Sequence, residues 1–150
     1  MTGGISRNGM EPEWIAREST KSNQLIRAWM LQEQGDVDTA VDLYAQVAET
    51  EEELADYCLR IGLSEKAWHH QFAAASTWAS AGDLHRALQQ CEKMLNDKTV
   101  SAAMFKEVRD YAEKLREQRR QWLVFRQQFQ NAAEPLGEES VRATHAVSVG

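Results

Sequence analysis

Proline and glycine are scarce through most of this chain, and neither long hydrophobic runs nor strand patterns are present. Pro12 and Pro135 are the only prolines, and just Gly35, Gly62 and Gly82 lie between them. Proline and glycine interrupt regular structure, so their scarcity is typical of helices joined by tight turns. β-Branched residues are sparse and no stretch alternates between apolar and polar residues, so the sequence predicts no strands.

Further absences exclude several classes of protein. The longest apolar run is only a few residues long, too short to span a bilayer. The first ten residues have neither the apolar centre nor the cleavage pattern of a secretory signal. Cys58 and Cys91 lie far apart among apolar neighbours, so each is predicted to be a small core residue in a reducing compartment. We expect a cytoplasmic protein without a membrane partner.

Charge and length favour one mildly acidic globular domain. The 150 residues are 43% apolar and 27% charged, with a net charge of −6, which gives the whole molecule no attraction to nucleic acid. This length allows a single domain with a real core. We predict a disordered start at 1–10, a helical domain at 11–134 and a flexible tail at 135–150.

Capping signals divide the domain into predicted helices. Glycine followed by aspartate, at 35–36 and again at 82–83, predicts a helix end and the N-cap of the next helix. Thr50-x-x-Glu53 fits a capping box and predicts a further helix start. The predicted helices run from 12 or 21 to 34, 37–49, 50–61, 64–81, 84–96, and from 97 or 99 to 133.

The two Gly-Asp pairs belong to an internal repeat. "GDVDTA" at 35–40 returns as "GDLHRA" at 82–87, 47 residues later. Six apolar positions follow the first Gly-Asp pair at helical spacing, and each has an apolar counterpart 47 residues later. They are Val37, Ala40, Val41, Tyr44, Val47 and Ala48, against Leu84, Ala87, Leu88, Cys91, Met94 and Leu95. A small residue precedes each glycine by seven positions, and a large apolar residue by four (Ala28 and Leu31; Ala75 and Trp78). The repeated unit is therefore a helical hairpin.

This pattern resembles the tetratricopeptide repeat family over residues 21–96. That resemblance implies an all-α fold, an array of antiparallel helix hairpins forming an α-solenoid with a right-handed superhelix, here with a long C-terminal helix. The period differs, because the family repeats about every 34 residues, and the predicted helix at 51–61 accounts for the excess. Gln24 and Arg27 stand where the family has large apolar residues. With only two repeats, the last helix must cap the array.

The resemblance also implies a concave groove lined by the first helix of each hairpin. Trp29 and Phe72 would anchor a partner peptide there, unless they are simply core residues. The predicted groove residues are Ser22, Leu25, Trp29, Gln32, Glu33, His69, Phe72 and Ser76. The set holds no Lys or Arg, so a clamp for a peptide carboxylate is not predicted.

Charge is distributed unevenly along the chain. Residues 36–56 contain eight acids and no base, whereas residues 114–126 contain five bases and one acid. Four interpretations stay open: the two regions are solvated faces, the last helix folds back on the acidic region, two chains associate through the two regions, or each region binds a separate partner. The basic and aromatic residues of the last helix form a predicted assembly surface: Lys114, Arg116, Arg119, Arg120, Trp122, Phe125, Arg126 and Phe129.

No motif in the sequence indicates catalysis, a cofactor or a metal. His69 and His70 are adjacent and would point about 100° apart on a helix, so they cannot chelate one metal together. Asp36 and Asp38 resemble a carboxylate pair, but they are explained as the N-cap and a first-turn acid at the positive end of a helix dipole. We expect no enzyme, but a scaffold or adaptor that binds another protein or itself, with a homodimer as one form. A self-assembling subunit, or an accessory subunit whose basic helix contacts a substrate, are the alternatives; nucleic acid is not the expected partner.

Overall fold

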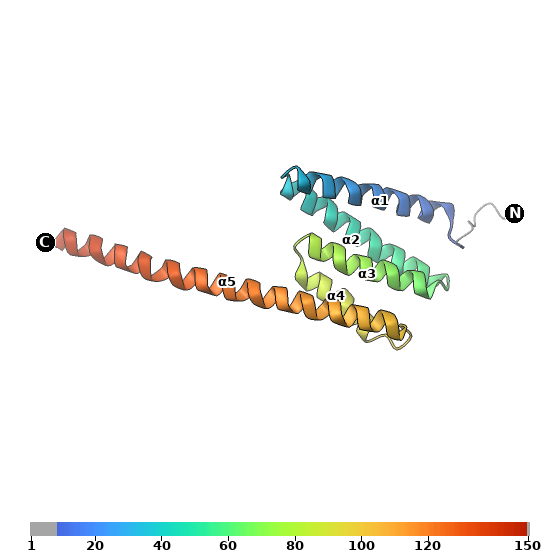
Figure 1. Cartoon of the computed structure of the whole chain (residues 1–150). Helices are drawn as coiled ribbons and strands as arrows, with labels where there is room; N and C mark the ends of the chain where they lie inside the picture. The colour runs from blue at the N-terminus through green and yellow to red at the C-terminus, as the bar shows by residue number, and fades with distance from the viewer. Residues whose placement is uncertain (1–8, 150) are drawn as a thin grey trace. The chain divides into compact units, whose positions relative to one another are not determined.

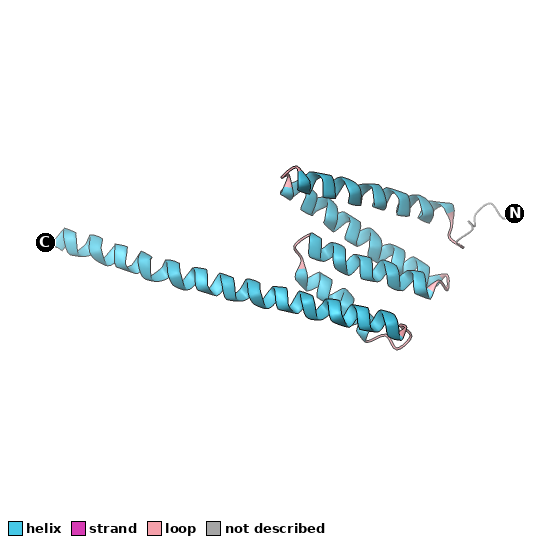
Figure 2. Cartoon of the chain, in the orientation of Figure 1, coloured by secondary structure: helices cyan, strands magenta, loops and turns pink. Residues whose placement is uncertain are grey.

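The computed structural model describes residues 9–149, with the backbone alone described from residue 133 onward. Within this range the chain is all-α, as predicted, and has no strand (Figures 1 and 2). Its helices are α1 (Pro12–Glu33), α2 (Val37–Arg60), α3 (Ser64–Ser80), α4 (Leu84–Leu95) and α5 (Ala102–Val149). The chain divides into two compact units after Leu115, so the second unit is the remainder of α5. In the first unit, α1 packs against α2, α2 against α3, and α3 against α4.

The turns after α1, α2 and α3 share one hydrogen-bonded geometry. After α1, the N–H groups of Gly35 and Asp36 donate to the carbonyls of residues 32 and 31, at 3.0 and 2.9 Å. The turn after α3 repeats these bonds 47 residues later, at 3.0 and 2.9 Å. Gly35 and Gly82 have φ values of 86° and 82°, which glycine adopts without steric strain. The predicted helix ends at both glycines are confirmed.

The helix that follows each Gly-Asp pair begins with the predicted cap. The carboxylates of Asp36 and Asp83 accept the N–H groups of Thr39 and Arg86, at 3.4 and 3.0 Å. These bonds satisfy donors that have no partner inside the helix.

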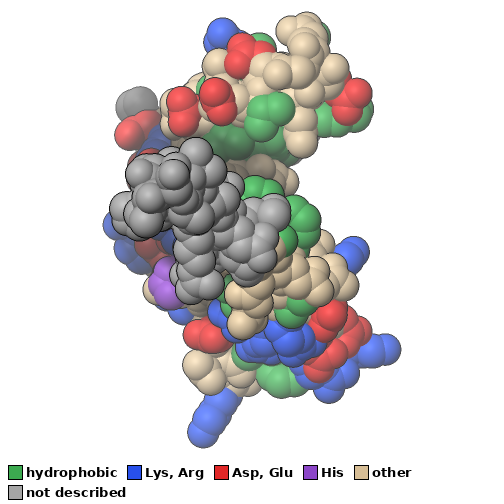
Figure 3. Space-filling view, turned by 90° about the vertical axis from the view of Figure 1, so that its left-hand side faces the viewer, with side chains coloured by type: hydrophobic (Ala, Val, Ile, Leu, Met, Phe, Trp, Pro, Cys, Tyr) green, Lys and Arg blue, Asp and Glu red, His purple; other side chains and the backbone are tan. Residues whose placement is uncertain are grey.

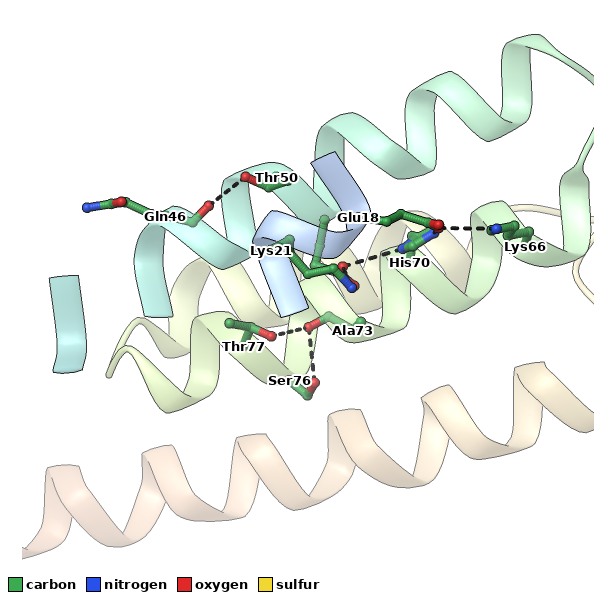
Figure 4. A network of polar contacts seen from close by, with 10 residues as sticks. Glu18, Lys21, Gln46, Thr50, Lys66, His70, Ala73, Ser76 and Thr77 are labelled. Atoms are coloured by element: carbon green, nitrogen blue, oxygen red, sulfur yellow. Dashed lines mark hydrogen bonds and ion pairs between the residues drawn. The ribbon is translucent and has the colours of Figure 1, made fainter. Parts of the chain in front are cut away.

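The predicted break at Thr50 is wrong, because α2 continues to Arg60. The Thr50 hydroxyl donates to the carbonyl of Gln46, 3.1 Å away, one turn earlier in the same helix (Figure 4). The hydroxyl is therefore used inside the helix rather than as a cap. Glu53, the other half of the predicted capping box, pairs instead with Arg17.

Two other predicted boundaries also differ from the structure. Met10 is fully buried against the cluster that contains Leu54, Tyr57 and Cys58, so it does not belong to a disordered start. The prediction of disorder for residues 1–8 lies outside the described residues. At the other end, residues 135–149, predicted as a flexible tail, lie within α5.

The start of α5 is later than predicted. Asp97 accepts bonds from the Thr99 N–H and hydroxyl, at 2.9 and 2.6 Å, and both bonds lower the pKa of its carboxyl. Asp97 therefore stabilises the loop, while the hydroxyl of Ser101 accepts the N–H of Met104 and caps the helix.

The core of the first unit forms where helices meet through small and large apolar side chains. Ala28, Ala40 and Tyr44 pack between α1 and α2. The largest cluster joins α3, α4 and the start of α5, and its members include Ala75, Trp78, Ala87, Leu88, Cys91, Met94, Met104, Val108, Ala112 and Leu115. Cys58 and Cys91 are buried, as predicted. The residues predicted from the internal repeat therefore supply the α1–α2 contact and part of the largest cluster, whereas Leu54, Tyr57 and Cys58 lie in a cluster outside the repeat.

Candidate interaction surfaces

Helix α1 carries a row of large apolar side chains that its own chain leaves exposed. Ile26, Trp29 and Met30 are 55%, 61% and 54% exposed. Their i, i+3, i+4 spacing places them on one side of the helix. Ala28 and Leu31, on the other side, pack against α2. Trp29, Met30 and Glu33 line one open hollow. We call Ile26, Trp29, Met30 and Glu33 the edge surface.

Acidic side chains follow the edge surface in the sequence. Glu33 belongs to the surface, and the exposed Asp36, Asp38 and Asp42 come after it, so residues 26–42 hold four acids against a single base, Arg27, a net charge of −3. The upper part of Figure 3 shows acidic and hydrophobic side chains next to one another on this face. A partner for this surface must therefore supply both apolar area and positive charge.

The predicted groove residues on α1 are all exposed. Ser22, Leu25, Trp29, Gln32 and Glu33 lie at the surface, and Gln32 accepts a hydrogen bond of 2.7 Å from the hydroxyl of Tyr44 on α2. That bond holds Gln32 in place, so Trp29 is the large side chain of this group that is most available to a partner.

The predicted groove residues on α3 have different environments. His69 is exposed, whereas Phe72 is half-buried and contacts the ring of Tyr111, with 5.3 Å between centroids. The Ser76 hydroxyl donates to the carbonyl of Ala73, 3.0 Å away (Figure 4). Over residues 9–132, no hydrogen bond, ion pair or ring contact joins these three residues to the α1 group. Phe72 serves the packing of α3 on α5, and the groove as a continuous site stays a prediction.

The second unit presents an aromatic row of its own. Trp122, Phe125 and Phe129 are 56%, 59% and 68% exposed and follow i, i+3, i+7 spacing, with the first two rings stacked at 6.0 Å. Arg126 completes the same side of the helix. We call Trp122, Phe125, Arg126 and Phe129 the distal surface.

The predicted basic residues around the distal surface are mostly exposed. Lys114, Arg119, Arg120 and Arg126 are exposed and Arg116 is half-buried. Arg120 pairs with Glu117 one turn earlier, and this hydrogen-bonded ion pair lowers the pKa of the Glu117 carboxyl. Residues 116–132 hold four arginines against that one acid, a net charge of +3.

A buried ionic cluster joins α1, α2 and α3. Glu51 is only 2% exposed, and its Oε1 lies 2.7 Å from Lys21 Nζ and 3.4 Å from His70 Nδ1. Glu18 Oε1 lies 2.8 Å from the other ring nitrogen of His70 and 3.2 Å from Lys66 Nζ (Figure 4). Glu51 Oε1 receives no well-angled hydrogen bond, so its contacts are charge–charge in character. Each carboxylate of the cluster has a lysine ammonium beside it, Lys21 for Glu51 and Lys66 for Glu18.

Sequence reasoning missed this cluster, although one signal was present. Glu51 follows Val47 by four residues and precedes Leu54 by three, so it occupies an apolar position of α2. Its partners come from other helices, and spacing within one helix cannot identify them.

The acidic run at 36–56 is therefore only partly a solvent-exposed surface. Besides Glu51, the carboxylate of Glu52 accepts bonds from Trp78 Nε1 and Gln90 Nε2, at 2.7 and 2.9 Å. Glu53 pairs with Arg17. The other acids of this run are exposed: Asp36, Asp38, Asp42, Glu49 and Asp56.

Neither a metal centre nor a membrane span is found in the part of the chain that the structure describes. No three His, Cys, Asp or Glu side chains there are grouped to hold a metal ion. None of its helices combines the length and the apolar character that crossing a bilayer requires. No protein-family model matches this chain, and no curated protein or solved structure matches it either.

Proposed function

We propose that this protein is a non-catalytic interaction module, a scaffold or adaptor, and that the edge surface binds a helical segment of a protein partner. The observation that carries the proposal is the row of Ile26, Trp29 and Met30, each more than half exposed on a helix whose other side is packed. Contiguous exposed apolar side chains rimmed by charges are typical of protein-binding sites. Tryptophan is among the residues that contribute most to binding energy at such sites.

The proposed architecture is a tetratricopeptide-like array. Two helical hairpins, α1–α2 and α3–α4, share the same turn, and each buries an alanine at the same position of its second helix, Ala40 and Ala87. The period of 47 residues is compatible with such an array, because α2 has 24 residues where α4 has 12. The additional turns of α2 lengthen the first hairpin without adding a helix.

The mechanism of binding would combine apolar anchors with charge. A partner helix would bury its own apolar stripe against Trp29 and Met30, as amphipathic helices do in hydrophobic grooves. The acids beside the edge surface would raise the rate of encounter with a basic partner and repel acidic ones. Enzymatic chemistry has no part in this proposal.

Affinity capture with matched variants tests the proposal. The bait is the full chain, as wild type, as Ile26→Ser/Trp29→Ser, and as Leu59→Ser/Ile61→Ser, a control that also alters two exposed apolar residues. A protein, including an untagged copy of this chain, that is retained by wild type and control but lost from the edge variant supports the proposal. Equal recovery with all three baits contradicts it.

A further inference from the structure

We infer that the occupant of the edge surface is the distal surface of a second copy of this chain. The inference rests on the proposed function, because it takes the edge surface to be a binding site and adds the identity of the partner. Each surface is described on its own unit, and the contact proposed joins two different molecules.

The two surfaces have the same spacing. Ile26, Trp29, Met30 and Glu33 stand at i, i+3, i+4 and i+7 of α1, and Trp122, Phe125, Arg126 and Phe129 stand at the same intervals of α5. Each set therefore covers two helical turns, about 10 Å of helix. Stripes of equal length and period can interlock along two nearly antiparallel or parallel helices.

Charge complementarity identifies a second copy as the occupant. The sequence segment that contains the edge surface carries −3 and the segment that contains the distal surface carries +3, counted over residues 26–42 and 116–132. Two edge surfaces would bring negative charges together, and two distal surfaces would bring positive charges together. Repulsion therefore disfavours edge–edge and distal–distal pairing. The edge–distal contact is the arrangement that joins opposite charges as well as two apolar rows.

The placement of the charges along each helix also sets the orientation. Glu33 is the C-terminal member of the edge surface, and Asp36 and Asp38 follow it in the chain. Three of the four arginines, at 116, 119 and 120, lie before Trp122, at the N-terminal end of the distal surface. Only an antiparallel arrangement brings these two ends together. In that arrangement Ile26 faces Phe129, and Glu33 faces Trp122 with the arginines beyond it.

Such a contact joins two different patches and can be used in two ways. If two copies exchange distal helices reciprocally, the contact forms twice and the two-fold dimer closes; this interface is isologous. If each copy binds the next one head to tail, the contact is heterologous and links copies into longer chains. Both forms require an intact edge surface on one molecule and an intact distal surface on the next.

Complementation between variants tests the inference. Light scattering and sedimentation equilibrium measure the mass of wild type, of the edge variant Ile26→Ser/Trp29→Ser, and of the distal variant Trp122→Ser/Phe125→Ser, up to several hundred micromolar. Wild type is expected above the monomer mass of 17.1 kDa. Each variant alone is expected to bind itself about 100-fold more weakly, because it lacks two anchors. An equimolar mixture of both variants is expected to form a heterodimer, since one intact contact remains.

Other results would overturn the inference. If the edge variant stays associated while the distal variant does not, distal surfaces bind one another. A monomeric wild type would exclude a second copy as the occupant of the edge surface. A distal helix that binds its own chain would also give this result. The proposed function is judged separately: if wild type is monomeric, capture of another protein that depends on Trp29 would still support it, and only the second copy as occupant would be excluded. The control Leu59→Ser/Ile61→Ser should retain the wild-type mass, and circular dichroism should be unchanged for all variants, because the altered side chains are exposed.

Cross-linking tests the orientation with matched cysteine pairs. Gln34→Cys in one copy and Gln121→Cys in another face each other only in the antiparallel arrangement. Gln34→Cys with Gln130→Cys is the corresponding pair for the parallel one. Preferential cross-linking of the first pair by a short bismaleimide is expected, and preferential cross-linking of the second would refute the proposed geometry.

Discussion

The rings of Phe72 and Tyr111 contact each other across α3 and α5, with 5.3 Å between centroids and 51° between their planes. This pair distinguishes two aromatic residues that look alike in the sequence. Phe72→Ala is expected to lower the free energy of unfolding by about 2 kcal/mol, because it removes a half-buried ring and its aromatic partner contact. Trp29→Ala should change it by less than about 0.5 kcal/mol, since the side chain is exposed.

Urea unfolding of both variants measures the difference. If Trp29→Ala destabilises the protein as much as Phe72→Ala, Trp29 serves the core and the edge surface loses its main anchor.

Glu51→Gln is expected to destabilise the protein by about 3 kcal/mol, because the Lys21 ammonium, whose side chain is only 15% exposed, would lose its carboxylate partner. Changing both Lys21 and Glu51 to methionine should cost less than the single change, since no unpaired lysine then remains. Thermal or urea unfolding of the single and double variants tests this order. A double variant less stable than Glu51→Gln would show that the ion pair itself, rather than charge balance, stabilises the junction of the three helices.

Gly82→Ala should cost about 1 kcal/mol, because alanine at a φ of 82° is strained. A methyl group there would meet no atom within 4 Å, so crowding adds nothing. Gly82→Asn should cost less, as asparagine tolerates this region better. The urea midpoint is expected to be highest for wild type, lower for Gly82→Asn and lowest for Gly82→Ala. An alanine variant as stable as wild type would contradict the role assigned to this turn.

Stability should fall in alkaline solution, in part through Cys58. Burial raises the pKa of its thiol, the nearby carboxylates of Glu18 and Glu51 raise it further, and Lys66 opposes them. Folding thus favours the protonated thiol. That contribution is fully present below the thiol pKa of the unfolded chain, about 8.5, and is lost as the pH rises through the higher folded value.

Melting temperatures measured from neutral pH to about two units above the ordinary thiol pKa test this dependence. The Cys58→Ala variant should lose stability less steeply than wild type over that range. Burial also raises the pKa of Tyr111, which remains in both proteins, so the difference between them isolates Cys58. Identical slopes would show that the Cys58 thiol does not contribute.

Local chemistry explains which features could be predicted from the sequence. The turns at Gly35 and Gly82 depend on a glycine conformation and an aspartate cap within a few residues, so the sequence is sufficient. The break predicted at Thr50 used the same kind of signal. There, however, the hydroxyl had a second partner, the carbonyl of Gln46 in the same helix, and the continuous apolar side of α2 favoured one long helix.

The candidate surfaces depend on tertiary structure and were therefore less predictable. Whether an aromatic residue is an anchor or a core residue is decided by the helix that covers it. Tyr111 covers Phe72, whereas Trp29 remains exposed. The cluster around Glu51 joins residues more than 15 positions apart in the chain, from three helices.

The contact between Lys21 and Glu51 also determines where the chain tolerates a change of length. Lys21 precedes Ala28 by two helical turns, and both residues meet α2 at once. One residue inserted between them would rotate the two positions apart by about 100°, so one of these contacts would be lost. The length and rotation of α1 between the ionic cluster and the hairpin turn are therefore fixed by two contacts at once, and an inserted residue in this part of the helix is expected to destabilise the fold.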